Sequence, residues 1–139
     1  MVDGRGMGCA PRRGVRAKNI EDVVVYREST AAAVAVSALL DRPVFSKDFD
    51  LKNQLSRSSS RIGPLIAEGF GQLTDKHLAI YLGRARGSAL ETRDHLSKAL
   101  NSKFISQDEC TDLRSRYEVI GKRLTRWIGW ECQDFCVWA

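Results

Sequence analysis

The sequence lacks the alternating apolar and polar runs, bounded by turn residues, that are typical of β-strands. Proline is scarce, with only Pro11, Pro43 and Pro64, so helices meet few interruptions. No apolar run approaches the roughly 18 residues that a membrane-spanning helix needs. The arginine-containing N-terminus has no apolar segment behind it, as a signal peptide would have. These absences predict an all-α, cytoplasmic protein that does not span a membrane.

Cysteine and histidine are too few and too widely spaced for a familiar metal site. The four cysteines are Cys9, Cys110, Cys132 and Cys136. None of them forms a CxxC pair, and Cys132 and Cys136, one helical turn apart, provide at most half of a site. His77 and His95 lie about five turns apart on one predicted helix, so they cannot share a metal within one chain. We expect reduced thiols, no metal and no cofactor.

The formal net charge of +5 is unevenly distributed. The first 19 residues contain four glycines, no aliphatic period and five basic side chains against Asp3. Such a segment buries too little apolar surface to fold, so residues 1–19 are predicted to be a disordered basic tail. Its arginines either contact phosphates or serve no function. The remaining residues, 20–139, are nearly neutral, so a basic surface there requires charge segregation.

Three stretches carry apolar or small residues at steps of three and four, the period of antiparallel helices packed in a bundle. The first set is Leu51, Leu55, Ser58, Ile62 and Leu65 or Ile66. The second is Leu78, Leu82, Ala85, Ala89, Thr92, Leu96 and Ala99. The third is Cys110, Leu113, Tyr117, Ile120, Leu124 and Trp127. Together with an earlier helix they predict an antiparallel up-down-up-down four-helix bundle over residues 20–139.

The expected helices span about 20–40, 49–70, 74–101 and 106–130. The first has a wide, alanine-rich apolar side whose seam is expected at Val23, Tyr26, Thr30, Ala33, Ser37 and Leu40. The expected N-caps are Asn19, Thr74 and Ser106. Phe45 and Phe49 are expected to close one end of the bundle. Pro64 is expected to bend the second helix, because an interior proline removes a backbone hydrogen bond.

Glycines mark the turn between the second and third helices. Gly69 and Gly71 follow an apolar helix face, where a glycine in the left-handed conformation closes the helix end. Gly83 and Gly87 lie inside the third helix, where each costs about 1 kcal/mol relative to alanine. Either a neighbouring backbone approaches them closely or the helix tolerates weak helix formers, and we favour close packing.

Several segments resemble the motifs of a known bacterial family. They are Val25-Tyr26, Gln54-Leu55, the stretch IAEGFG at 66–71 and the stretch LGRARGSALE at 82–91. From about residue 20 to 127 the chain resembles the four-helix-bundle proteins first noticed as products of intervening sequences in 23S ribosomal RNA genes. The motif residues carried over are Gln54, Glu68, Gly69, Gly71, Gly87, Ser88 and Glu91.

The resemblance implies an up-down-up-down bundle that assembles into a ring-shaped homopentamer. Relatives include the accessory variability proteins of diversity-generating retroelements, which bind a reverse transcriptase and nucleic acid through a basic surface. The chain departs from the family at Leu65, where many members have an asparagine, and at Leu78, where an aromatic residue is usual. These departures concern the bend in the second helix and the polar contact that the asparagine would make.

Two motif carboxylates, Glu68 and Glu91, lie near or within the apolar seams, where a buried charge needs a partner. We expect one of them to pair with Arg57, Arg61 or Arg84, either inside the bundle or at a contact between subunits. The alternative is acid–base chemistry or a di-metal site. Bundle di-metal sites need Glu-x-x-His pairs, which are absent here. A structural role is therefore favoured over a catalytic one.

The leading functional hypothesis is a non-catalytic, homo-oligomeric bundle that binds RNA, DNA or a nucleic-acid enzyme such as a reverse transcriptase. Its candidate contacts are Arg57, Arg61, Arg84, Arg86 and Arg93. The alternative is a structural or protein-interaction scaffold without nucleic-acid binding, anchored by Trp127, Trp130 and Trp138. An enzyme is disfavoured because no nucleophile–base pair, metal motif or phosphate loop is readable.

Overall fold

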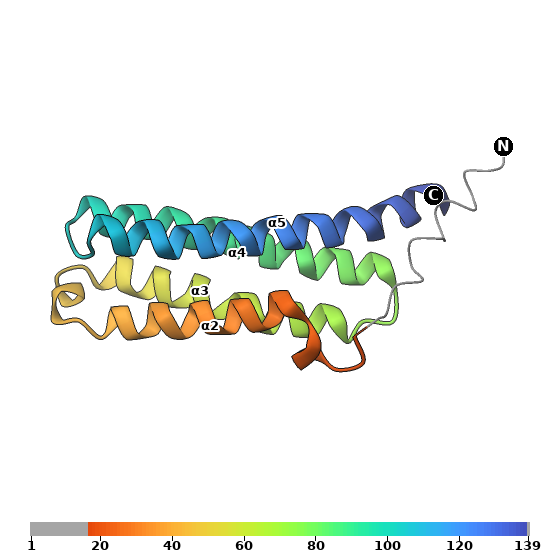
Figure 1. Ribbon diagram of the computed structural model, residues 1–139, viewed down its shortest axis with the longest axis horizontal. Coiled ribbons are helices and arrows are strands. Elements are labelled where there is room, and N and C mark those ends of the chain that lie inside the picture. The colour runs from red at the N-terminus through yellow and green to blue at the C-terminus, as the bar shows by residue number, and fades with distance from the viewer. Residues whose placement is uncertain (1–16, 139) are drawn as a thin grey trace.

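The computed structural model describes residues 17–138, with side chains described up to residue 129. Four long helices lie side by side, and each runs antiparallel to the one before it (Figure 1). They are α2 (Val24–Leu40), α3 (Phe49–Phe70), α4 (Asp75–Asn101) and α5 (Gln107–Trp138). Because α5 also packs against α2, the predicted up-down-up-down bundle closes. None of the described helices is both long and apolar enough to cross a membrane.

The core follows the predicted seams of α3, α4 and α5. Leu55, Ile62 and Ile66 of α3 are fully buried, and so are Leu82, Leu96 and Leu124 of the next two helices. Only the seam ends Leu65, Leu78 and Trp127 are half-buried. Midway along the bundle the core is polar, since the Thr92 hydroxyl lies 2.9 Å from the Ser58 hydroxyl and 2.8 Å from the Ser88 carbonyl oxygen.

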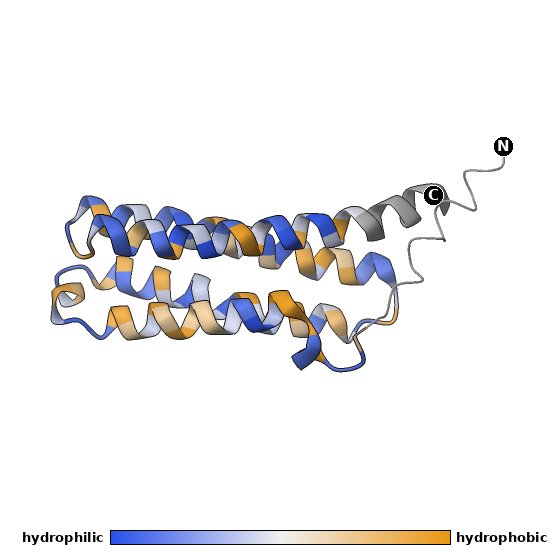
Figure 2. Cartoon of the chain, in the orientation of Figure 1, coloured by the Kyte–Doolittle hydropathy of each residue, from blue (hydrophilic) through white to orange (hydrophobic). Residues whose placement is uncertain are grey.

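The first helix differs from its prediction. It begins at Val24, preceded by the 3-10 helix η2 (Ile20–Asp22) and an extended Val23, and Asn19 makes no side-chain capping bond. Its buried residues are Val25, Ser29, Ala32, Val36, Leu39 and Leu40, so most of the predicted seam was wrong. Alanines lie on several sides of this helix, so two possible seams that differ by one residue would bury side chains of similar small size. Valines occur on both sides of this helix, since Val25 and Val36 are buried whereas Val24 and Val34 are 45% and 66% exposed, and apolar colours cover much of α2 (Figure 2).

The other helix starts are capped by side chains. Asp48 accepts a hydrogen bond from Leu51 N at 3.0 Å at the start of α3, and Thr74 accepts from His77 N at 3.2 Å at the start of α4. Ser106 caps α5 as predicted. The backbone of α5 continues to Trp138, beyond the predicted end near residue 130.

The glycine turn between α3 and α4 corrects the sequence prediction. Among the described residues no glycine has a positive φ, and Gly71 ends α3 in a right-handed conformation with φ −80°. Gly69 is needed for space, because a Cβ there would lie 2.9 Å from Tyr81 Cβ. The left-handed residue is Lys103, with φ 62°, which follows α4. There Phe104 N donates to Ala99 O at 2.9 Å, the bond that closes a Schellman motif.

Three further predictions can be compared with the fold. Phe45, in the 3-10 helix η3 (Pro43–Lys47), is fully buried and meets Phe104 edge to face at 5.3 Å, whereas Phe49 is 62% exposed. Phe45 therefore closes this end of the bundle with Phe104. Helix α3 continues through Pro64, and its bend there remains a prediction. Gly83 and Gly87 have no neighbouring atom within 4 Å of a Cβ, so close packing within the chain was wrong.

Candidate nucleic-acid interface

The five predicted arginines do not share one surface, because α4 has α3 on one side and α5 on the other. Arg61 Nη2 lies 3.5 Å from Glu91 Oε2, which places Arg61 beside α4 on its α3 side. Arg86 Nε donates to Thr125 Oγ1 at 2.8 Å, which places Arg86 beside α5. The structure therefore divides the predicted contacts into two groups.

The first group lies along the seam between α3 and α4. Arg57 and Arg61 are one helical turn apart on α3, and the Arg84 guanidinium lies 5.4 Å from the Tyr81 ring centroid on α4. This α3–α4 face consists of Arg57, Arg61, Arg84 and Lys98 with Glu68, Glu91 and Asp94. Cations and carboxylates alternate on it, and Lys98 pairs with Asp94 at 3.1 Å. Its charges largely cancel.

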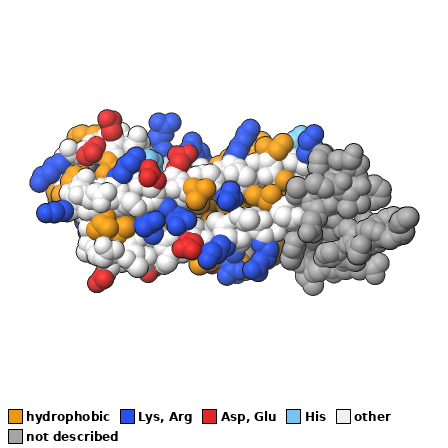
Figure 3. Space-filling model, turned by 90° about the horizontal axis from the view of Figure 1, so that it is seen from above, with side chains coloured by type: hydrophobic (Ala, Val, Ile, Leu, Met, Phe, Trp, Pro, Cys, Tyr) orange, Lys and Arg blue, Asp and Glu red, His pale blue; other side chains and the backbone are white. Residues whose placement is uncertain are grey.

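The second group lies between α4 and α5 and is joined by basic residues that the sequence argument missed. The positive charges of Arg93 and Arg114 both act to lower the pKa of Glu118, and Lys122 Nζ lies 3.1 Å from Glu118 Oε1. We define the α4–α5 basic face as Arg86, Arg93, Arg114 and Lys122. Glu118 is the carboxylate among them. Figure 3 shows the molecule from the side of α4 and α5.

Arg114 and Lys122 had a visible signal in the sequence. They lie four residues before and four residues after Glu118, so the three form one row on α5. The row runs alongside the buried seam that contains Tyr117. Which neighbouring helix faces this row depends on how the four helices are arranged around the core, and periodicity alone leaves that open.

The two motif carboxylates are not buried within the chain, which corrects the prediction that they lie inside the bundle. Glu68 is exposed, and the Glu91 side chain is 54% exposed in its pair with Arg61. The predicted pairing of Glu91 with an arginine is present, but in water, where such a pair is worth about 0–1 kcal/mol. Both residues point outward because they lie on the side of their helices away from the buried seam.

The family-like motif therefore has an internal part and an external part. Gly69 and Ser88 are both buried. Gly69 lies against Tyr81, and the carbonyl oxygen of Ser88 accepts a hydrogen bond from Thr92 Oγ1. The exposed members are Gln54, Glu68, Gly71, Gly87 and Glu91. Core packing explains the buried members only.

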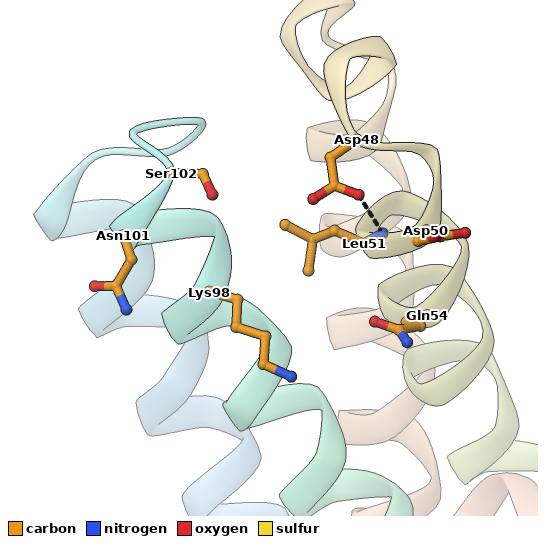
Figure 4. A pocket seen from close by; sticks show the side chains of 7 residues that line it. All are labelled: Asp48, Asp50, Leu51, Gln54, Lys98, Asn101 and Ser102. Carbon is orange, nitrogen blue, oxygen red and sulfur yellow. Dashed lines mark hydrogen bonds between the residues drawn. The ribbon is translucent and has the colours of Figure 1, made fainter.

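An open hollow of about 430 Å³ lies between the start of α3 and the end of α4 (Figure 4). Asp48, Asp50, Leu51 and Gln54 line it from α3, and Lys98, Asn101 and Ser102 line it from α4. Asp48 is already engaged in capping α3, and Lys98 is paired with Asp94. The lining contains no nucleophile with an adjacent base, so it does not form a catalytic set.

The buried titratable groups do not form a reactive centre either. Burial lowers the pKa of His95 and raises the pKa values of Cys110 and Tyr117, so all three are uncharged near neutral pH. Cys110 Sγ lies 3.6 Å from the Leu96 carbonyl oxygen. Among the described residues no three metal-ligating side chains gather in one place.

Some predictions fall on parts of the chain that are not described. The basic tail up to residue 16 lies outside the described residues. The side chains of Trp130, Cys132, Cys136 and Trp138 do so as well. Trp127, the remaining predicted anchor, is half-buried and packs against the core. It is therefore a weaker candidate for a docking anchor than its sequence position suggested.

Comparison with known proteins agrees with the fold. The model of the 23S rRNA-intervening sequence protein family matches residues 21–126. A solved structure of a protein of unknown function from the S23 ribosomal protein family of Bacteroides thetaiotaomicron is 25% identical, with a TM-score of 0.72. The match covers 76% of this chain and 98% of that chain. No curated protein matches. By the extent of the family match, the chain belongs to the 23S rRNA-intervening sequence protein family.

Proposed function

We propose that this chain is a non-catalytic protein that binds RNA or DNA through the α4–α5 basic face. The observation that carries the proposal is the segregation of charge between the two sides of α4. On one side cations and carboxylates largely cancel, and on the other Arg86, Arg93, Arg114 and Lys122 share a face with a single carboxylate, Glu118, which pairs with Lys122. The nearly neutral part of the chain, residues 20–139, thereby presents a cationic strip.

The chemistry of this strip suits phosphate groups. Arginine and lysine donate charge-assisted hydrogen bonds to phosphate oxygens, and such contacts carry no sequence information. Arg86 is held in place by Thr125, and Arg114 makes no ion pair with any other residue that the structure describes. A prepositioned guanidinium and an unpaired one are both available to a nucleic-acid backbone that lies along the α4–α5 basic face. We therefore expect sequence-independent binding that weakens steeply with salt.

Fluorescence anisotropy with labelled oligouridine and a labelled DNA duplex, over a series of salt concentrations, tests the proposal. The double substitution Arg114→Gln with Lys122→Gln should weaken binding. It should also reduce the slope of log K against log salt by about 0.7–0.9 for each phosphate group that the variant no longer neutralises. Both side chains are exposed, so the fold should be retained, which thermal melting checks.

The matched control is the double substitution Arg57→Gln with Arg84→Gln on the α3–α4 face. It removes the same charge, so a purely global charge effect would weaken binding equally in both variants. The proposal requires a clearly larger loss of affinity from the α4–α5 variant. Absence of wild-type binding at low salt would contradict nucleic-acid binding altogether.

A protein-interaction scaffold is the second candidate, and one feature of α2 favours it. The outer side of α2 carries exposed Ala31, Val34 and Ala38, with Val34 66% exposed. An uncharged, apolar helix side suits contact with another protein, including another copy of this chain in the homopentamer that the family implies. Light scattering of wild type and Val34→Lys tests self-association. A reverse transcriptase or other partner should be captured regardless of nuclease treatment if the contact is purely protein.

A further inference from the structure

One carboxylate, Glu118, lies on the α4–α5 basic face and forms an ion pair with one of its cations. Lys122 Nζ lies 3.1 Å from Glu118 Oε1, one helical turn along α5. Arg114 lies one turn before Glu118 on the same helix, and the charge of Arg93 on α4 also acts to lower the pKa of Glu118, although of the three cations only Lys122 forms an ion pair with it. The hydrogen bond from Lys122, followed by the charges of Lys122 and Arg93, lowers the pKa of Glu118. Glu118 is therefore a bound anion within a cationic site.

The site also contains a donor that Glu118 leaves unused. Arg93 Nε is buried, yet it has no hydrogen-bond partner among the described residues. The Glu118 side chain is 47% exposed and that of Lys122 75% exposed, so an anion from solution can reach the cluster. A buried N–H without a partner destabilises the protein, and a movement of the Arg93 side chain that brought Nε to an incoming acceptor would remove this penalty.

We infer that Arg93, Arg114 and Lys122 form a binding site for one phosphate group of a nucleic-acid backbone, and that the Glu118 carboxylate occupies this site until the phosphate displaces it. The inference rests on the proposed function and deepens it, since it assigns a specific phosphate site and a competitor within the chain. A backbone phosphate carries one negative charge on two non-bridging oxygens, as a carboxylate does, so it can take the place of the Glu118 carboxylate beside these cations. Binding breaks the Lys122–Glu118 pair, and the displaced side chain moves into solvent.

If Glu118 competes with the phosphate, removing the charge of Glu118 should strengthen nucleic-acid binding. Glu118→Gln removes the competing charge but keeps the size of the side chain, so oligouridine should bind about threefold more tightly, the effect expected for losing one exposed ion pair. The matched control is Asp112→Asn, which removes an equal charge from an exposed carboxylate paired with Arg116 at 3.4 Å on another side of α5. Adding Lys122→Gln to Glu118→Gln should abolish the gain.

Anisotropy titrations of wild type and the variants, with melting curves to verify folding, give distinct outcomes. Tighter binding by Glu118→Gln than by Asp112→Asn supports the site. Equal gains from both variants, or no gain from Glu118→Gln, overturn the inference while wild-type binding leaves the proposed function standing. If wild type does not bind, the proposed function fails. Binding gained only in Glu118→Gln then still supports the site, and no binding in either protein overturns it.

Discussion

The guanidinium of Arg42 pairs with the carboxylate of Glu109 and thereby joins the end of α2 to the first turn of α5. Arg42 Nη1 lies 2.9 Å from Glu109 Oε1, although 67 residues separate the two in the sequence. The same carboxylate accepts a hydrogen bond from Ser106 N at 2.9 Å, and Ser106 Oγ accepts one from Glu109 N at 3.1 Å. This reciprocal pair of bonds is a capping box. One side chain therefore starts a helix and closes the bundle.

The pair predicts an acid-dependent loss of stability. The hydrogen bond from Arg42 lowers the pKa of Glu109 to about 2, from an ordinary value of 4.5. The stabilisation is therefore complete above about pH 4.5 and is lost as the pH falls towards 2. Since the Arg42 and Glu109 side chains are 44% and 31% exposed, Arg42→Gln should cost about 1 kcal/mol at neutral pH. Urea unfolding at several pH values measures this.

In the Arg42→Gln variant the loss of stability between pH 4.5 and 2 should be smaller than in wild type. Lys98→Gln, which breaks an exposed pair within one helix, is the control and should change stability by only about 0.3–0.5 kcal/mol. An Arg42→Gln protein with the wild-type acid transition would show that the pair does not couple to folding.

Substitution by alanine should have opposite effects on stability at two helical glycines, Gly69 and Gly87. Gly69→Ala places a Cβ 2.9 Å from Tyr81 Cβ, so α3 and α4 must separate, at a cost of about 1–3 kcal/mol. Gly87→Ala meets no atom within 4 Å and should stabilise the protein by about 1 kcal/mol. Thermal melting compares the two. Destabilisation by Gly87→Ala that depends on protein concentration would instead indicate a contact between copies at α4.

Lys103 is in a backbone conformation that favours glycine. With φ 62° it lies in the left-handed region, which costs most residues roughly 1–2 kcal/mol. Lys103→Gly should therefore raise the unfolding free energy by about 1 kcal/mol. Ser102→Gly, at an ordinary φ of −80°, is the control and should lower stability slightly. Equal effects of the two substitutions in urea unfolding would rule out relief of strain.

Tyr117 carries a polar atom that the core does not satisfy. The residue is fully buried, and its hydroxyl has no hydrogen-bond partner among the described residues. Tyr117→Phe removes this group without changing the ring, so it should stabilise the protein by about 1 kcal/mol. Tyr26→Phe, at a half-buried position, should be nearly neutral. A loss of stability in Tyr117→Phe would reveal a buried water that binds the hydroxyl.

His95 should add a second pH dependence, nearer neutrality. Burial, followed by the charge of Lys98, lowers its pKa below the ordinary 6.5, whereas Asp94 and Glu91 act in the opposite direction. The unfolded chain therefore takes up a proton before the folded one does, and stability is lost as the pH falls below about 6.5. His95→Gln should flatten stability between pH 6.5 and 5 in urea unfolding.

Sequence reasoning predicted the bundle because α3, α4 and α5 each have one clearly apolar seam. Leu55, Leu82 and Leu124 are all fully buried, as their spacing indicated. The same reasoning failed for α2, where alanines on several sides leave the period ambiguous. A seam is predictable when large and small side chains contrast around the helix, and α2 has little contrast.

The candidate interface was less predictable than the fold. Arg84 and Arg86 are neighbours in the sequence, yet they lie on opposite sides of α4. Which arginines share a surface depends on which helix occupies each side of α4, information that a single periodic stretch does not contain. Arg114 and Lys122 can be assigned to the α4–α5 basic face only once α5 is known to pack beside Arg86 and Arg93 of α4.

The packing of α2 against α5 has a consequence for how the protein is made. During synthesis α2 and α3 can pair early, but the side of α2 that will meet α5 stays in water until the last helix has been translated. Bringing these two helices together spans most of the chain and so carries the largest loop entropy of the bundle. At that stage two nascent copies can exchange their final helices, and domain-swapped dimers are the misfolded product to expect when the protein is expressed at high concentration.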